Sequence, residues 1–311
     1  MQIIFRTAPN YFWFFIIWCI SKITQYILNQ EKTVWEVIWE RSLIYFDNDE
    51  YNLFINGIFL TTSIGGLWLL ALYTFFDFTQ KPKFIRKYKV NPNTHEPPDL
   101  KGMMKILILA AFNATFITKP TFILIFYVLK WREFPDIQVL PNIQTVLISS
   151  FISDHLYDAV VYCVHRTLHH RFFYKSIHKL HHEYKSPIAF AALYSHPVEQ
   201  VFQNSLPLCA GLFVLRCHIA TAWIYMISSM FSSTITHSGY HLPFLNSPQW
   251  HDYHHMKFDC NYSTIGLMDR IFGTDKMYRN SVCEKRDELL ISFKSTRELY
   301  PDKNERIIKD Q

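Results

Sequence analysis

The chain has 311 residues, of which 50% are hydrophobic and 18% charged, and its formal net charge is +5. The excess of 31 basic over 26 acidic residues is too small and too dispersed for a nucleic-acid-binding protein, so we exclude that class. Uninterrupted apolar runs alternate with charged connectors, which is typical of polytopic membrane proteins.

Residues 1–50 are expected to form an N-terminal interfacial or anchor segment. The run 11–28 is apolar and rich in aromatic residues, but Lys22 interrupts it, so we expect it to lie at the level of the lipid headgroups, with a membrane crossing as the alternative. No small-x-small cleavage site follows this run. We therefore expect the segment to stay attached and not to be removed as a signal peptide.

Residues 51–142 are predicted to be the transmembrane region. The stretch 53–76 holds 24 residues without a charge. As a helix it would be about 36 Å long, compared with about 30 Å for the hydrocarbon core of a bilayer. The connector 81–89 that follows is strongly basic, so the positive-inside rule predicts that it is cytosolic.

A second apolar stretch, 106–129, is interrupted by Lys119 and Pro120. Because proline removes a backbone donor, we expect two half-spans or a helical hairpin that returns the chain to the cytosolic side. A single kinked crossing is the alternative, and it would leave Lys130 on the opposite side.

Residues 143–280 are predicted to form the histidine-cluster domain, and residues 281–311 a cytosolic tail. The apolar stretch 143–164 leads into the first histidines, and 201–236 is expected to be a hairpin or a pair of short helices. The charged end from residue 276 onward lacks apolar periodicity and is expected to be partly mobile. We therefore predict an all-α, polytopic integral membrane protein with about four membrane-embedded helices and a histidine-rich metal-binding helical cap on the cytosolic face.

Fourteen of the 15 histidines lie between residues 155 and 255, and ten of them form four clusters. On an α-helix, residues at i, i+3 and i+4 share a face, so each cluster is predicted to direct two or three imidazoles at one point. The clusters are His165-x-x-x-His169, His178-x-x-His181-His182, His237-x-x-x-His241 and His251-x-x-His254-His255.

These ten histidines are predicted to bind metal. Protonated imidazoles at such spacing would repel one another, and buried neutral ones would each need partners for both ring nitrogens. A shared cation solves both problems, and a structural or pH-sensing histidine cluster is the alternative. Ten nitrogens suit two ions with about five ligands each. Imidazole binds iron, copper, nickel and zinc alike. Iron is favoured because O2 activation needs a pair of redox metals.

The remaining histidines carry weaker signals. His196 lies between clusters and is a candidate for a role at the site, whereas His95, His155, His170 and His218 are expected to be structural.

Two other residue types near the clusters could bear on the site. Asp154 and Asp158 precede the first cluster and are expected either to accept hydrogen bonds from imidazole N–H groups or to be solvated. The six cysteines show no Cys-x-x-Cys or Cys–His spacing, so they are expected to be reduced and not to form a structural zinc site.

Three features carry a resemblance to a known family over residues 145–280. They are the four clusters, the stretch His-Ser-Gly-Tyr-His-Leu-Pro-Phe-Leu at 237–245, and the ending Met-Asp-Arg-Ile-Phe-Gly-Thr-Asp at 268–275. Together they resemble the fatty acid hydroxylase superfamily, also called the sterol desaturase family. The similarity is greatest to the branch with the sterol C4-methyl oxidases and the fatty acid hydroxylase domain-containing proteins. The C4-methyl oxidases typically carry Asp where His241 stands, so His241 adds to the metal count and loosens the link to a sterol.

The resemblance implies an O2-dependent di-iron oxygenase that hydroxylates an alkyl C–H bond of a lipid, most directly a C4-methylsterol. It also implies a multi-pass location in the endoplasmic reticulum membrane with the site on the cytosolic face. Cytochrome b5 and its reductase are the implied electron donors, since the chain has no nucleotide-binding or haem signature of its own. The alternatives are a fatty acyl or sphingolipid hydroxylase, a sterol desaturase, or a metal-binding membrane protein without enzyme activity.

Overall fold

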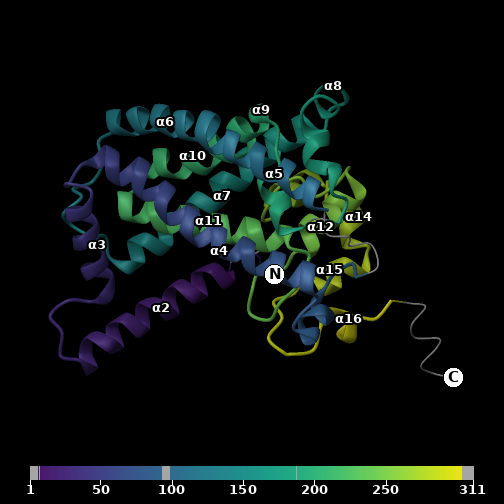
Figure 1. Cartoon of the computed structure of the whole chain (residues 1–311), viewed down its shortest axis with the longest axis horizontal. Helices are drawn as coiled ribbons and strands as arrows, with labels where there is room; N and C mark the ends of the chain where they lie inside the picture. The colour runs from purple at the N-terminus through teal and green to yellow at the C-terminus, as the bar shows by residue number, and fades with distance from the viewer. Residues whose placement is uncertain (1–5, 7, 93–98, 187, 303–311) are drawn as a thin grey trace.

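The computed structural model describes residues 6, 8–92, 99–186 and 188–302, and every regular element in these ranges is a helix. The predicted all-α class is therefore confirmed. Figure 1 shows long helices packed side by side as a bundle, with short helices and loops gathered as a cap at one end.

Two helices precede the bundle, α2 (Ala8–Ile27) and α3 (Val34–Tyr45). α3 begins at a capping box in which Thr33 and Glu36 each accept a hydrogen bond from the other's backbone N–H. α2 leaves the bundle obliquely (Figure 1, purple) and exposes apolar side chains, with Tyr26 87% exposed. This exposed apolar side is compatible with the predicted place at the headgroups, which stays a prediction.

Two helical runs are long and apolar enough to cross a membrane, Asn52–Thr79 and Leu100–Trp131. The first joins a π-helical turn, η1 (Asn52–Gly57), to α4 (Ile58–Thr79). It contains the apolar stretch that the sequence predicted as a transmembrane helix.

The second run is one continuous helix, so the predicted hairpin or pair of half-spans is wrong. It consists of α5 (Leu100–Phe112), η3 (Asn113–Thr118) and α6 (Lys119–Trp131). η3 is a π-helical turn directly before Pro120, and a wider turn accommodates a residue that cannot donate a backbone hydrogen bond. The chain runs along the bundle once here, from α5 on the side of the cap to α6 at the end away from it (Figure 1).

Three more helices complete the bundle. α7 (Ile143–Leu168) and α11 (Ile219–His237) both run toward the cap and end there (Figure 1). α10 (Leu206–Leu215) is joined to α11 through Arg216, which has a left-handed backbone with φ of 50°. The sequence left a hairpin or a pair of short helices open here, and the structure has one short helix, α10, followed by one long helix, α11.

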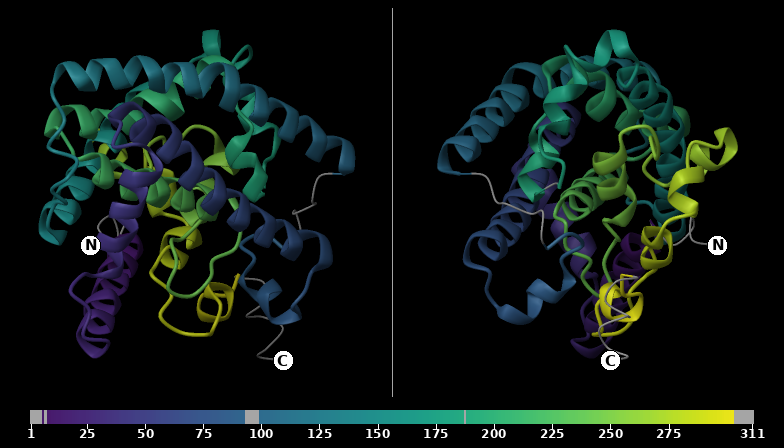
Figure 2. Two further views of the ribbon diagram at one scale, coloured as in Figure 1. Left: turned by 60° about the vertical axis from the view of Figure 1, so that its left-hand side comes forward. Right: turned by 90° about the vertical axis from the view of Figure 1, so that its right-hand side faces the viewer.

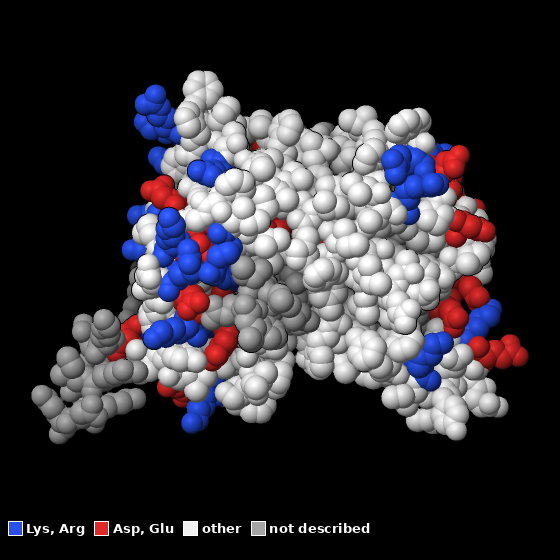
Figure 3. Space-filling view, turned by 180° about the vertical axis from the view of Figure 1, so that it is seen from behind, with Lys and Arg blue, Asp and Glu red and all other residues white. Residues whose placement is uncertain are grey.

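The surface of the molecule is divided by charge. In the view from behind, Lys, Arg, Asp and Glu gather at the two ends and leave a broad, almost uncharged band between them (Figure 3). Ile64, Trp68, Ile108 and Leu124 of the two long runs are 64–66% exposed. Apolar surface of this extent is what a bilayer covers, so the bundle is that of a membrane protein.

Residues 276–302 fold back onto the cap, whereas the sequence analysis expected a partly mobile tail there. Asp287 and Leu290 are buried, and Arg6 forms an ion pair with Asp287 at 2.8 Å. The chain is thus tied together from both ends of the described residues. The short elements are η2 (Lys83–Tyr88), α8 (Arg171–Tyr174), η4 (His178–Glu183), η5 (Ala189–Leu193), α9 (Pro197–Glu199), η6 (Gln200–Ser205), α12 (Gln249–Lys257), α13 (Leu267–Phe272), α14 (Lys276–Arg279), α15 (Val282–Arg286) and α16 (Thr296–Leu299).

Candidate metal centre

The clustered histidines lie in the cap, at the ends of long helices or on short ones. His165 lies in the last turn of α7, and His169 directly follows that helix with helical backbone angles. His237 is the last residue of α11, and α12 carries the last cluster. The second cluster lies on η4, which is a 3-10 helix and not the α-helix that the spacing predicted. Two long helices of the bundle therefore end beside two short helices of the cap.

The structure brings nine of the ten predicted ligands into two groups, and within each group the ligand atoms lie within 4.8 Å of one another. The two groups contain five and four histidines, whereas the sequence predicted two sites with about five ligands each. The five-histidine group is His165, His169, His178, His182 and His254, and the four-histidine group is His181, His237, His251 and His255.

The two His-x-x-His-His clusters each serve both groups. In each cluster the residues at i and i+4 join one group, and the residue at i+3 joins the other. η4 contributes His181 to the four-histidine group, while α12 contributes His254 to the five-histidine group. Adjacent residues of a helix point about 100 to 120° apart, so a pair of neighbouring histidines can reach two sites. The prediction that each of these clusters points to one spot was wrong.

The Nε2 atoms converge at the spacing of metal ligands. In the five-histidine group, the Nε2 of His182 lies 3.1 to 3.2 Å from three other Nε2 atoms. In the four-histidine group, the Nε2 of His251 lies 2.8 and 3.0 Å from those of His237 and His255. Nitrogens about 2.1 Å from one ion are roughly 3.0 Å apart at right angles and roughly 3.4 Å apart in a tetrahedron. Both groups therefore fit a metal ion.

The contacts of the Nδ1 atoms show which ring nitrogen of each histidine is free to bind a metal. Five Nδ1 atoms face main-chain carbonyl oxygens, which can only accept, so these Nδ1 atoms carry the hydrogen. Each of these rings presents an unprotonated Nε2 to its group, and such lone pairs repel one another unless a cation lies between them. The five contacts join His165 to Tyr262, His181 to Tyr194, His237 to Ser233, His254 to Cys260 and His255 to Tyr184.

Burial keeps the rings of the cap in their neutral form. It lowers the pKa of His181 to about 4. It also lowers the pKa of His182 and His255, and the neighbouring imidazoles lower it further because like charges disfavour protonation. At neutral pH these rings are therefore unprotonated and able to bind a metal.

Glu199 is a residue of the site that sequence reasoning missed. Its Oε1 lies 2.9 Å from the Nδ1 of His178, and both side chains are buried. Burial raises the pKa of Glu199. The contact fixes the orientation of the His178 ring, as carboxylates commonly do for histidine ligands. One signal could have identified it, because Glu199 is the only Asp, Glu, Lys or Arg within residues 186–215.

Two buried aspartates hold the loop that supports the ring of His165. Asp158 accepts a hydrogen bond from the backbone N–H of Ile265 at 2.5 Å, and Asp269 accepts one from that of Tyr262 at 2.9 Å. Asp154 instead contacts a tyrosine hydroxyl. The expectation that these acids bind imidazole N–H groups or are solvated is therefore wrong for Asp158, which binds main-chain groups.

His241 lies in neither group, although it was predicted as a ligand. α11 ends at His237, and Gly239 turns the chain with φ of 70°. The helical spacing on which that prediction depended does not continue to residue 241. The side chain is buried, and its Nδ1 lies 3.5 Å from the Ser247 hydroxyl.

The other histidines also lie outside the two groups. His170, His196 and His218 each accept a hydrogen bond from a backbone N–H at the start of a helix. His155 contacts a main-chain carbonyl on its own helix. His196 is therefore the N-cap residue of α9. His95 lies outside the described residues.

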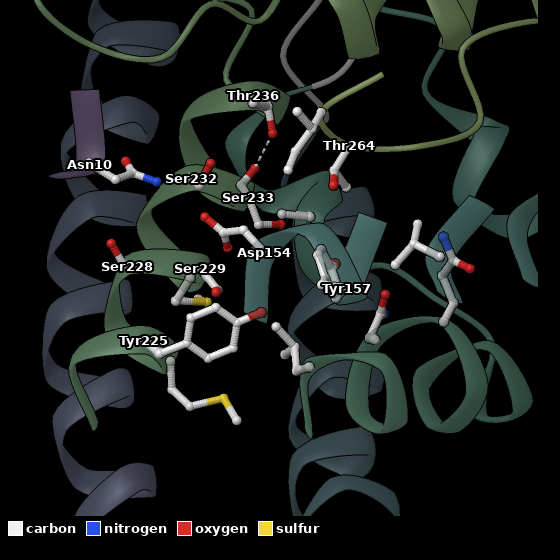
Figure 4. Close-up of a pocket in the computed structure, with 18 of the residues that line it drawn as sticks. Asn10, Asp154, Tyr157, Tyr225, Ser228, Ser229, Ser232, Ser233, Thr236 and Thr264 are labelled. Atoms are coloured by element: carbon white, nitrogen blue, oxygen red, sulfur yellow. Dashed lines mark hydrogen bonds between the residues drawn. The ribbon is translucent and has the colours of Figure 1, made fainter. Parts of the chain in front are cut away.

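A cavity of about 340 Å³ adjoins both groups. Apolar and hydroxyl side chains of α2, α4, α7 and α11 line much of the rest of it (Figure 4), and amide side chains of η6 line another part. An apolar molecule in this cavity would lie beside the ring nitrogens. The cavity touches His165 and His178 of the five-histidine group and His181, His237 and His251 of the four-histidine group.

Comparison with known proteins identifies relatives across most of the chain. Residues 151–274 match the family model described as fatty acid hydroxylase, and this range contains all nine grouped histidines. The chain is 35% identical over 278 residues to fatty acid hydroxylase domain-containing protein 2 of Homo sapiens, with 88% of this chain and 82% of that protein covered.

Two further relatives extend the comparison. Methylsterol monooxygenase 1 of Gallus gallus is 34% identical over 209 residues, with 63% of this chain and 68% of that protein covered. Fatty acid hydroxylase ahd1 of Mycosarcoma maydis is 32% identical over 232 residues, with 74% of this chain and 60% of that protein covered. No solved structure matches the chain significantly.

Proposed function

The chain belongs to the fatty acid hydroxylase family, and from that premise we propose that it is an O2-dependent di-iron oxygenase that hydroxylates an alkyl C–H bond of a membrane lipid. The main support is the convergence of nine imidazoles in two groups beside one cavity. Each group would hold one iron ion. The ligands would be His165, His169, His178, His182 and His254 for one ion, and His181, His237, His251 and His255 for the other.

Bound iron would supply an oxidant derived from O2, which side chains alone cannot provide. In the overall reaction the substrate C–H bond becomes C–OH with one oxygen atom of O2. The other oxygen atom leaves as water, with two electrons and two protons taken up. We propose cytochrome b5 and its reductase as the source of these electrons.

Groups of the chain itself orient the histidine rings and exclude water from the cavity. Main-chain carbonyls and Glu199 hold the ring orientations, so the Nε2 atoms face inward before any ion binds. Apolar walls such as Phe59, Phe122 and Leu208 surround the cavity and exclude water from the reacting carbon.

We further propose a multi-pass location in the endoplasmic reticulum membrane with the cap on the cytosolic side. The basic connector that the positive-inside rule assigns to the cytosol packs against the cap, where Lys87 donates a hydrogen bond to the carbonyl of Phe293. Figure 2 shows the connector (blue) and the C-terminal segment (yellow) at the same end of the molecule, and Asn91, just after the connector, donates a hydrogen bond to Asp252, the neighbour of His251. A soluble electron-transfer domain can approach the metal groups from this end.

One of two candidate substrates is a C4-methylsterol, because methylsterol monooxygenase 1 is a relative at 34% identity. A fatty acyl or sphingoid chain is the second, supported by relatives that carry the name fatty acid hydroxylase. His241 still differs from the Asp that the C4-methyl oxidases typically carry at this position, although its ring belongs to neither group. A sterol desaturase using the same ligands is a further alternative.

The test is turnover by purified, iron-loaded protein with a competent reductant. We expect O2 consumption that depends on lipid, and a hydroxylated product by mass spectrometry from a panel of 4-methylsterols, fatty acyl lipids and sphingoid bases. Lipid analysis of cells that lack the protein would show which of these classes accumulates. Iron-loaded protein that consumes no O2 with any lipid would favour a metal-binding protein without enzyme activity.

A further inference from the structure

One wall of the cavity is polar, although the space lies inside the bundle. Asp154 comes from α7, Tyr225 and Ser229 come from α11, and Tyr11 comes from α2. Figure 4 shows the oxygen atoms of Asp154, Tyr225 and Ser229 facing a common space. Three helices thus bring carboxylate and hydroxyl groups to one place.

These groups keep unused hydrogen-bonding capacity. The Asp154 carboxylate accepts a hydrogen bond from the Tyr11 hydroxyl, and no ion pair to Asp154 occurs within the described residues. Tyr225 is 2% exposed, and its hydroxyl makes no hydrogen bond of normal geometry in the described part of the chain, although Ser229 lies beside it. Buried polar groups are rarely left in this condition without a partner.

The ordinary structural explanation for hydroxyls inside a helical bundle does not cover this set. Ser and Thr side chains in helices commonly donate to the carbonyl one turn earlier, as Thr234 does to Met230. Ser229 makes no such bond to a carbonyl among the residues the structure describes. A half-buried carboxylate without a cation also needs donors, and one tyrosine leaves part of the accepting capacity of Asp154 unused.

We propose that Asp154, Tyr11, Tyr225 and Ser229 form a hydroxyl anchor, a site that binds the alcohol end of a long-chain lipid whose tail extends to the metal groups. A substrate hydroxyl can donate to the Asp154 carboxylate and accept from Tyr225. A free fatty acid would instead place its carboxylate against Asp154, and the two like charges would repel. This inference rests on the proposed function only in taking the molecule in the cavity to be a lipid.

The anchor also sets which carbon reaches the metal groups. Asp154 precedes His165 by 11 residues on α7, and Ser229 precedes His237 by eight residues on α11. These separations correspond to about 16 Å and about 12 Å along the helices. An extended alkyl chain covers such a length with about 10 to 13 carbons, since each C–C bond of about 1.5 Å advances a zigzag chain by only about 1.3 Å.

This length favours a chain-like substrate over a C4-methylsterol. The methyl group of a 4-methylsterol is attached next to the carbon that bears the hydroxyl, so a sterol held at the hydroxyl anchor would keep that methyl group far from both groups of histidines. The oxidised carbon is therefore expected to be remote from the alcohol.

Binding of radiolabelled hexadecan-1-ol to the purified full-length protein tests the anchor without turnover. We expect Asp154→Asn to weaken binding about tenfold or more and Tyr225→Phe about fivefold, since each removes one hydrogen-bonding partner but keeps the shape. Tyr127→Phe is the matched control because Tyr127 is 60% exposed and does not line the cavity. Thermal denaturation of each variant verifies that it is folded.

Unlabelled competitors in the same assay test which end group the hydroxyl anchor binds. Hexadecane and hexadecanoate are both expected to compete at least tenfold more weakly than unlabelled hexadecan-1-ol, the first because it has no hydroxyl and the second because its carboxylate repels that of Asp154. Equal competition by hexadecane, stronger competition by the acid, or unchanged binding by the Asp154 and Tyr225 variants would each overturn the proposal.

The position of the hydroxyl group added to the substrate tests the predicted distance between the hydroxyl anchor and the metal groups. Iron-loaded protein should oxidise hexadecan-1-ol and octadecan-1-ol at the same distance from the alcohol, about 10 to 13 carbons away. Oxidation next to the alcohol would overturn the inference and leave the proposed function standing. Binding that depends on Asp154 without oxidation of any lipid would support the anchor and contradict the proposed function.

Discussion

The five-histidine group and the four-histidine group are built from the same kinds of segment but differ in their exposure to the cavity. Two of the five rings line the cavity in one group, and three of the four rings line it in the other. The group with fewer nitrogens therefore faces the place where a substrate would lie. An ion held there by four imidazoles would keep more open positions for the O2 of the proposed reaction than an ion held by five.

The two groups also depend on different supports. In the five-histidine group, His165 and His254 are held by the carbonyls of Tyr262 and Cys260 in the loop after α12, and His178 by Glu199. In the four-histidine group the supports are main-chain carbonyls only, among the contacts within the described ranges. Side-chain substitution can therefore weaken the support of one group and leave that of the other intact.

The largest effect is expected from removing one ligand of either group. His254→Ala and His181→Ala should each abolish turnover and lower bound iron by at least half, because each removes a ring nitrogen that no nearby side chain replaces. Metal analysis by mass spectrometry and an O2-consumption assay measure the two quantities. His155→Ala is the control, since His155 lies outside both groups. Unchanged iron content and activity in either variant would refute the ligand assignment.

A smaller and one-sided effect is expected from Glu199→Gln. The change keeps the shape of the side chain but removes the carboxylate beside His178, and loss of such a partner weakens metal affinity about 10- to 100-fold. Titration with a chelator should therefore show one ion released earlier than in the native protein and the other unchanged.

Glu133→Gln is the matched control for this experiment, because the Glu133 side chain is 85% exposed at the far end of the bundle. If both ions of the Glu199 variant were released earlier to the same extent, the division into two separately supported groups would be incorrect.

The smallest effect is expected from His241→Ala. Iron content and turnover should match those of the native chain, because the ring of His241 lies outside both groups. Its burial predicts a modest loss of about 1 kcal/mol in the free energy of unfolding, seen as a small fall in the midpoint of thermal denaturation. Loss of one equivalent of iron would show instead that His241 is a fifth ligand of the four-histidine group.

The sequence predicted the members of the metal centre better than their division. His165 and His169 share a group as the spacing predicted, because the backbone remains helical through both residues. His181 and His254 go to the other group from their nearest neighbours, and this depends on how η4 and α12 are oriented in the fold. Spacing along one segment contains no information about that orientation.

Other features could not have been predicted because they are properties of the main chain. The carbonyls of Tyr262 and Cys260 that fix two rings are present in every residue, so no residue type marks them. The sequence correctly predicted the all-α class and the first long apolar helix. It failed at Pro120, because a π-helical turn absorbs the proline where composition suggested a break.

The exchange of His181 and His254 between the two groups has a consequence for insertions and deletions in the cap. η4 and α12 each carry rings of both groups, so one residue added to or removed from either helix would rotate ligands of both groups out of place together. Such a change is expected to abolish binding of both ions, unlike the loss of a single supporting contact.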